Sequence, residues 1–192
     1  MFEFNKIAKE LNKKYFYHIK PDKEIEEIIP LSMLKDKDKK AYNKAIKKYT
    51  GREDQLTTKI SLLDAEWQDC INLSTINPAL LFDLIFLLRL KNYDYNPNRT
   101  IIKFPIEILK DKRIVLYDDN KNFKKDEAYS KLNIKSYKEL KYIPEETVKY
   151  YIQCMKKNED PLIFASIPHI LCLDPIKISD GEEFVYDRNQ LY

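Results

Sequence analysis

Glycine is nearly absent from this chain, since Gly51 and Gly181 are the only two in 192 residues. Loops that cradle phosphate need glycine at several positions, where the backbone takes a positive φ or comes close to the ligand. Neither G-x-G-x-x-G nor G-x-x-x-x-G-K-[ST] can be written from the sequence. The sequence therefore argues against Rossmann dinucleotide binding, P-loop chemistry and the kinase glycine loop.

Cysteine and histidine are also scarce, with three and two residues. Cys70, Cys154 and Cys172 lie far apart and form no C-x-x-C pair, so we expect core positions in a reducing compartment. A structural zinc site, or any other metal site, is not expected. The N-terminus lacks the pattern of a secretion signal, and charges interrupt the longest apolar run, near residues 80–90. We therefore expect a cytoplasmic protein without a membrane partner.

The composition is that of one globular domain. Apolar residues make up 44% and charged residues 34%, and 34 basic against 31 acidic residues leave a net charge of +3. Charges of both signs are interspersed, which favours a solvated surface over a nucleic-acid footprint, although a nucleic-acid partner stays open. We expect residues 1–192 to form a single compact domain.

Hydrophobic periodicity alternates between the strand and the helix pattern, which predicts an α/β (α+β) domain with a sheet flanked by helices. Strands are expected at residues 15–19, 67–74, 100–104, 114–117, 161–173, 175–178 and 184–186. Helices are expected at residues 2–14, 38–49, 79–90 and 144–157, with Gly51 ending the second. Residues 92–99 are rich in turn formers, and residues 118–142 show little periodicity, so we expect the latter to be a surface excursion or a lid.

Both histidines interrupt apolar segments. His18 lies in Tyr-Phe-Tyr-His-Ile, where Tyr17 precedes it, and His169 follows Pro168. A neutral histidine can hold a ligand hydroxyl, or it can be satisfied by a backbone carbonyl in the core. We expect His18 to line a cavity, with the structural alternative open for both residues.

A second group of polar and aromatic residues surrounds Gly51. Arg52 follows Tyr49 at a helix exit, where a guanidinium can clamp a phosphate or carboxylate. Asp69 lies two residues after Trp67, the sole tryptophan, on an expected strand face that is otherwise apolar. A buried carboxylate needs a partner, so we expect Arg52 to pair with Asp69 or Glu53. A purely structural pair is the alternative.

The order of these segments resembles small ADP-ribosyltransferase-fold proteins, namely DNA-targeting ADP-ribosyltransferases and RNA 2′-phosphotransferases. The resemblance rests on Tyr-Phe-Tyr-His-Ile followed by Ile-Ile-Pro-Leu-Ser, then on Cys-Ile-Asn-Leu-Ser before Asn-Pro, and on two later strands, within residues 15–120. The chain also resembles small uncharacterised bacterial proteins with Lys-Tyr-x-Gly-Arg-Glu, Trp-x-Asp and Pro-His-Ile-Leu segments. That second resemblance implies no chemistry.

The first resemblance implies a split, bent, mixed sheet flanked by helices. It also implies a transferase acting on NAD, or a protein of this fold that only binds NAD or a nucleotide. Its catalytic residues would be His18 on the first strand, Ser74 on the second, and Glu159 or Asp160 where such proteins carry a late-strand Glu. The ligand-binding residues would be Tyr17, Tyr49, Arg52, Trp67, Asp69 and His169. The alternative is a non-catalytic protein-binding module, such as an immunity protein, an antitoxin or a phage-encoded inhibitor, with its tyrosines at the interface.

Overall fold

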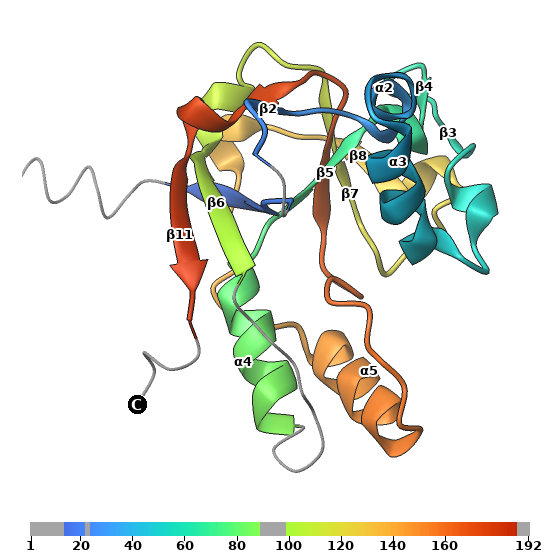
Figure 1. The fold of residues 1–192 in the computed structure, drawn as a ribbon, viewed down its shortest axis with the longest axis vertical. Helices are drawn as coiled ribbons and strands as arrows, with labels where there is room; N and C mark the ends of the chain where they lie inside the picture. The colour runs from blue at the N-terminus through green and yellow to red at the C-terminus, as the bar shows by residue number, and fades with distance from the viewer. Residues whose placement is uncertain (1–13, 22–23, 89–98, 188–192) are drawn as a thin grey trace, which may run out of the picture.

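The computed structural model describes residues 14–21, 24–88 and 99–187 of the chain. The helix expected at residues 2–14 and the turn-rich loop expected at residues 92–99 lie almost entirely outside these ranges. Within them, the protein is an α+β structure built on one large antiparallel sheet (Figure 1).

Among the described residues the large sheet has seven strands in the order β11-β6-β1-β5-β9-β7-β8. They are β1 (Tyr15–Ile19), β5 (Ile71–Ser74), β6 (Arg99–Pro105), β7 (Ile114–Tyr117), β8 (Tyr129–Lys131), β9 (His169–Cys172) and β11 (Glu182–Tyr186). Every ladder of this sheet is antiparallel, so the expectation of a mixed sheet is wrong. Two small sheets pair β2 (Glu27–Ile28) with β10 (Ile176–Lys177), and β3 (Lys59–Ile60) with β4 (Ala65–Glu66).

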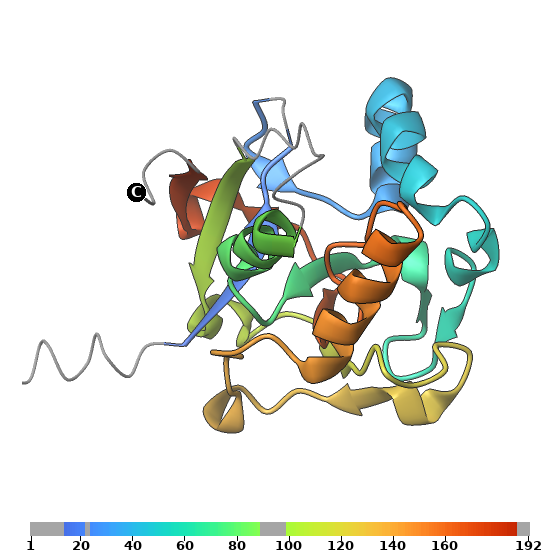
Figure 2. The ribbon, with the colours of Figure 1, turned by 90° about the horizontal axis from the view of Figure 1, so that it is seen from below.

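The helices flank this sheet in two groups. They are α2 (Leu31–Lys37), α3 (Lys39–Ile46), α4 (Pro78–Leu88) and α5 (Glu145–Lys156). Figures 1 and 2 show α4 and α5 side by side, while α2 and α3 form a separate group. Short 3₁₀ turns connect the elements: η1 (Lys47–Tyr49), η2 (Glu53–Gln55), η3 (Trp67–Asp69), η4 (Ile106–Leu109), η5 (Asp126–Ala128), η6 (Ile134–Ser136) and η7 (Ile178–Asp180). No helix in the described ranges is long and apolar enough to cross a membrane.

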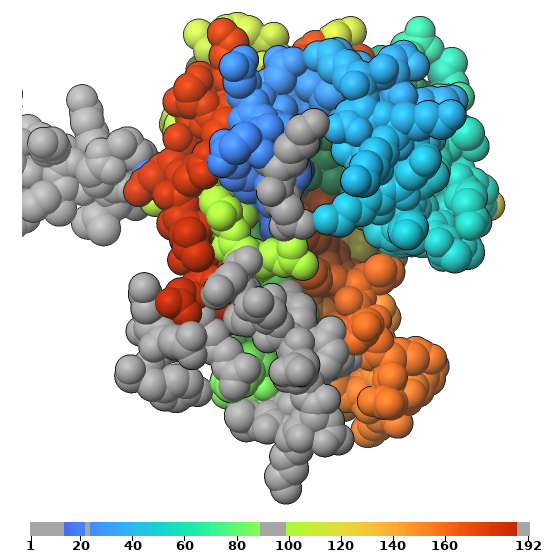
Figure 3. Space-filling model, in the orientation of Figure 1, coloured from blue at the N-terminus to red at the C-terminus, as the bar shows by residue number. Residues whose placement is uncertain are grey.

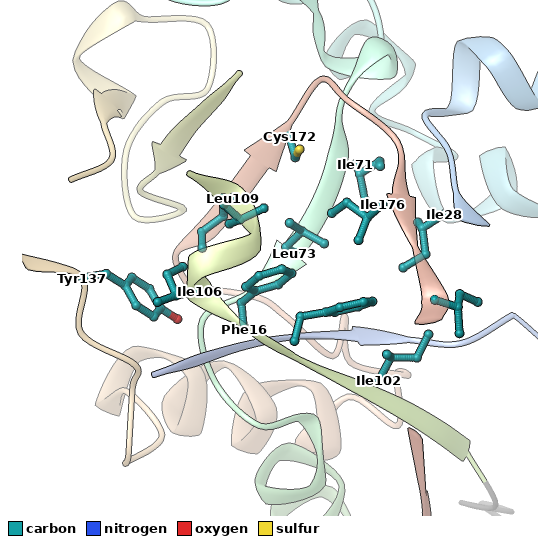
Figure 4. Packing of buried hydrophobic residues seen from close by; sticks show 13 residues of the cluster. Phe16, Ile28, Ile71, Leu73, Ile102, Ile106, Leu109, Tyr137, Cys172 and Ile176 are labelled. Atoms are coloured by element: carbon teal, nitrogen blue, oxygen red, sulfur yellow. The ribbon is translucent and has the colours of Figure 1, made fainter. Parts of the chain in front are cut away.

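The main hydrophobic core covers one face of the sheet. Ile71 and Leu73 of β5 point into it, because alternate residues of a strand face opposite sides. The rings of Phe16 and Phe104 stack there with centroids 5.2 Å apart, between neighbouring strands β1 and β6 (Figure 4). The other face of β5 carries Asn72 and Ser74, and those two residues line a pocket.

The strand expected at residues 67–74 begins later than its hydrophobic pattern suggests. Trp67–Asp69 is the 3₁₀ turn η3, because Glu66 and Asp69 cap each other: the Glu66 side chain accepts from Asp69 N, and the Asp69 carboxylate accepts from Glu66 N at 2.9 Å. The turn interrupts the alternation, so Trp67 lies on the pocket side and not with Ile71 and Leu73. Similarly, the late strand starts only at His169, and residues 161–168 form turns.

Residues 118–142 lie largely on the surface, as a surface excursion should, and are anchored to the fold at a few points. The segment contributes β8 to the sheet and buries Ala128, Tyr129 and Tyr137. The Tyr129 hydroxyl donates to Phe123 O at 2.6 Å. The local pattern is weak because the segment is held by long-range contacts and short turns, not by a long periodic element.

Both glycines occupy positions that a side chain would disturb. Gly51 has φ 81°, as expected for a residue that ends a helical stretch. Gly181 lies where an added Cβ would come within 2.7 Å of side-chain atoms of Ile102 and Phe104. The scarcity of glycine therefore leaves each one with a defined structural role.

Candidate functional site

A pocket of about 470 Å³ lies between the sheet, the α3–η1 region and the 161–168 turns. In the space-filling view the surface is hollowed between α3 and α5 (Figure 3). The pocket is lined by Tyr17, His18, Ile19, Lys48, Tyr49, Arg52, Gln55, Trp67, Asn72, Ser74, Tyr117, Asp119, Pro161, Leu162, Ile163, Phe164, Ala165 and His169. Its volume falls within the range of about 300–1,000 Å³ that small-molecule sites occupy.

One row of register partners crosses four neighbouring strands and forms the base of the pocket. Tyr17 of β1 lies opposite Ser74 of β5, Ser74 opposite His169 of β9, and His169 opposite Tyr117 of β7. Directly opposed residues of antiparallel strands present their side chains to the same face. Four residues from distant parts of the sequence are thus placed side by side by backbone pairing alone.

Strands β1 and β5 are only weakly paired at the point where this row passes from one to the other. In the described residues, Tyr17↔Ser74 is the one register pair that connects β1 to β5. On one side of the pair, residues 137–140 replace strand pairing: the Tyr137 hydroxyl donates to Tyr15 O, and Glu139 accepts from Tyr15 N. On the other side the strands part, so His18 reaches the pocket although it alternates with Tyr17 along β1.

Both histidines are held in the neutral state. Burial, followed by the positive charge of Lys48, lowers the pKa of His18 to about 4, against a smaller opposing effect of the Ile19 backbone. Burial likewise lowers the pKa of His169 to about 4, with the Ile167 backbone opposing and Lys48 contributing. Nδ1 of each ring is buried and makes no well-formed hydrogen bond. His18 therefore lines a cavity as expected, and its ring is not satisfied by two backbone bonds.

Two cations lie on one aromatic ring at the pocket wall. Lys48 Nζ and Arg52 Cζ are 5.2 Å and 5.4 Å from the Tyr49 ring centroid. The Arg52 guanidinium donates to Lys48 O through Nη2 at 2.9 Å, which fixes its direction. The expected pair between Arg52 and Asp69 is wrong, because Asp69 caps η3; Glu53 accepts from Gly51 N at 3.0 Å instead.

The remaining walls are aromatic and well ordered by contacts. Trp67 donates through Nε1 to the Tyr49 hydroxyl at 3.0 Å and meets Tyr117 edge-on with centroids 4.9 Å apart. Phe164 meets the His169 ring in a similar edge-on arrangement at 5.9 Å. These rings offer flat apolar surface against which a planar ligand group can stack.

Residues 161–165 form another wall of the pocket, and contacts with α5 hold the 161–168 segment in place. The hydroxyls of Thr147 and Tyr151 donate to Ala165 O and Ile163 O, the first at 2.9 Å. From the other side, Thr75 donates through Oγ1 to Pro168 O at 2.7 Å. The wall is thus attached to the rest of the fold through its backbone carbonyls.

Asp119 supplies the one carboxylate among the lining residues, all of which belong to the described ranges. It lies two residues beyond Tyr117, past the end of β7, and its Oδ2 accepts from Ser166 N at 2.6 Å. Burial raises the pKa of Asp119, whereas the Ser166 amide, Tyr117 and the charge of Arg52 act in the opposite direction. The carboxyl is therefore partly desolvated yet close to a cation.

Most of the site residues proposed from the sequence meet in this pocket. Those that line it are Tyr17, His18, Tyr49, Arg52, Trp67, Ser74 and His169. Asp69, Glu159 and Asp160 lie outside the lining, and the last two are exposed on the approach to Pro161. The Ser74 hydroxyl donates to Ile76 O at 2.8 Å and accepts from Ile76 N at 3.3 Å, so it shapes the turn after β5.

Sequence reasoning missed Lys48, Tyr117 and Asp119, together with the 161–165 wall. A signal for Asp119 was present, because Asp-Asp-Asn directly follows the apolar strand Ile-Val-Leu-Tyr. Lys48 gave none, since it is one of many lysines in a helical stretch. Within the described residues, no group of three or more His, Cys, Asp or Glu side chains could hold a metal ion.

Comparisons with known proteins identify no relative of this chain. No protein-family model matches the chain, and no curated protein and no solved structure matches it either. The function therefore has to be argued from the geometry and chemistry of the pocket.

Proposed function

We propose that this chain is an ADP-ribosyltransferase-like protein that binds NAD in the pocket. The observation that carries the proposal is convergence: seven of the ten site residues proposed from the sequence, from Tyr17 to His169, line one cavity. The weak joint between β1 and β5 also supports the split sheet that the resemblance implies.

The pocket lining contains both cationic and aromatic side chains, which suit the pyrophosphate and the nicotinamide of NAD. Lys48 and Arg52 supply positive charge for the pyrophosphate, a role that a glycine-rich loop fills in other nucleotide sites. Tyr117 and Trp67 offer flat faces for the nicotinamide ring. A neutral His18 can donate or accept one hydrogen bond from a ribose hydroxyl without repelling the cationic nicotinamide.

The low pKa of both histidines has a functional consequence under this proposal. Charged imidazoles would add to the positive charge of Lys48 and Arg52 and would repel the nicotinamide ring, which is itself cationic. Burial keeps His18 and His169 neutral at physiological pH, so positive charge is confined to the lysine and arginine.

The alternative of a non-catalytic protein-binding module predicts that His18, Arg52 and Ser74 are scattered over a convex surface. They line one concave site instead. A concave site of this size is typical of small-molecule ligands, so the arrangement favours such a ligand over a protein partner.

Titration calorimetry and thermal denaturation with NAD and ADP-ribose test the proposal. NAD at about 100 times its Kd should stabilise the fold by about 2.7 kcal/mol. Lys48→Ala should weaken binding at least about tenfold, since it removes a charge-assisted contact. Lys47→Ala is the matched control, because Lys47 is adjacent and exposed and does not line the pocket. Absence of any shift at millimolar NAD in a cooperatively folded protein would overturn the proposal.

A further inference from the structure

Among the residues that the structure describes, the pocket lining holds a single carboxyl group, that of Asp119. Tyr117 lies opposite His169 in the β7–β9 ladder, and Asp119 follows two residues later on the same wall. The sequence resemblance instead suggested Glu159 or Asp160, which precede the late strand and lie outside the pocket lining.

The surroundings of Asp119 leave part of its hydrogen-bonding capacity unused. Oδ2 accepts from Ser166 N at 2.6 Å, and the carboxylate also accepts from the Tyr117 hydroxyl. An ionised carboxylate offers about four acceptor positions on its two oxygens. At least one position can therefore face a ligand without breaking the contact that fixes the 161–168 wall.

We propose that Asp119 accepts the proton of the attacking nucleophile when the pocket cleaves NAD, an inference that rests on the proposed function. The bond between the nicotinamide nitrogen and ribose C1′ breaks, and its electron pair leaves with nicotinamide, which becomes neutral. The oxygen of the acceptor, water in the simplest case, forms the new bond to C1′. The proton that this oxygen loses passes to Asp119 and then to solvent.

The other titratable groups facing the pocket are poorer proton acceptors. Protonation of His18 or His169 places a second positive charge near Lys48 in a desolvated site. The tyrosines Tyr17 and Tyr117 are neutral, since burial raises the pKa of each phenol. Burial of Asp119 favours its protonated form, so this is the group whose surroundings support proton uptake.

The negative charge of Asp119 also has a second use in the same step. Positive charge develops on the ribose as the nicotinamide departs, and a carboxylate in the same cavity stabilises it. The low polarity of the aromatic walls strengthens that interaction.

The test measures nicotinamide release from NAD by the full chain, together with the Kd of NAD by calorimetry. Asp119→Asn keeps an acceptor for Ser166 N but cannot take up a proton, so the rate should fall at least ~100-fold while Kd changes less than about threefold. Asp118→Asn is the matched control, because Asp118 lies outside the pocket lining and accepts from Asn120 N. At neutral pH it should keep the wild-type rate and Kd, and the acid side of its profile should move slightly to lower pH, because the charge of Asp118 contributes to the raised pKa of Asp119. The wild-type rate should also fall on the acid side at a pH above the ordinary range of aspartate.

Each other outcome has a definite meaning. If Asp119→Asn binds NAD and turns it over at the wild-type rate, the role of Asp119 is overturned and NAD binding stands. The same holds if the wild-type chain binds NAD but releases no nicotinamide above the rate without protein. If Asp119→Asn loses binding as well as turnover, Asp119 holds the ligand or the wall and is not the proton acceptor. If the wild-type chain does not bind NAD, the proposed function fails and the inference fails with it.

Discussion

The two faces of β5 meet their neighbours in different ways. Ile71 and Leu73 face the main core. Buried apolar side chains from five other strands, and from the turns η4 and η7, belong to the same cluster. Asn72 and Ser74 face the pocket, in the same row as His169. Burial on the first face is satisfied by contact alone. In the pocket, burial leaves Nδ1 of His18 and of His169 without a hydrogen-bond partner, and this lowers stability.

The core face of β5 has what a stable fold requires, whereas the pocket face has features of a ligand site. A buried polar atom without a partner lowers stability and calls for a reason outside folding. The pocket face combines two such atoms with two cations and one carboxyl group, whereas the core face carries none of these groups. We therefore expect substitutions on the two faces to have effects of different kinds.

The largest expected effect is found by comparing a core-facing and a pocket-facing residue of the same strand, β5. Leu73→Ala removes a fully buried side chain and leaves a cavity, so the free energy of unfolding should fall by about 2–5 kcal/mol. Asn72→Ala, one residue away on the pocket face, should cost less than about 1 kcal/mol. Urea denaturation of both variants measures the difference. Equal losses would mean that the pocket face supports the fold as much as the core does.

A second prediction concerns the pH dependence of stability, to which the histidines of the pocket contribute. The unfolded histidine has its ordinary pKa of 6.5 and the folded pKa of His169 is about 4, so between these values the unfolded chain binds more protons. Stability should be full above pH 6.5 and fall toward pH 4, by up to about 3 kcal/mol for this residue. His18 should contribute similarly.

Carboxyl groups also titrate in that range, so the measurement compares variants. The difference in unfolding free energy between wild type and His169→Gln should change with pH by the amount that the titration of His169 contributes. A difference that stays constant from pH 7 to pH 4 would place a charged, solvated His169 in the folded protein.

The third prediction concerns a residue that belongs to neither face. Asp69 caps η3, so Asp69→Ala should cost about 1 kcal/mol, the usual value of a side-chain cap. A buried ion pair with Arg52 would instead cost about 3–5 kcal/mol on loss of one partner. Chemical denaturation distinguishes the two, and a loss in the upper range would contradict the capping role.

Local patterns were informative where they coincide with the final structure. The aromatic and β-branched run at residues 15–19 forms β1, and the Pro-Glu-Glu start of α5 matches the preference of a helix N-terminus. Gly51 has the positive φ expected after a helical stretch. The mutual cap of Glu66 and Asp69 overrode the strand alternation at Trp67, because a local hydrogen-bonded turn competes directly with extended pairing.

The sequence by itself determined an α+β domain and identified which unusual residues could belong to a site, including His18, Arg52 and His169. It could not place Asp119, Lys48 or the 161–165 wall in that site, nor exclude Asp69, Glu159 and Asp160 from it. Those decisions came from the tertiary packing: strand register sets Tyr17, Ser74, His169 and Tyr117 in one row, and the helix and turns packed around that row bring in the other lining residues. Register joins residues far apart in the chain, and only the packed tertiary structure fixes which of them meet.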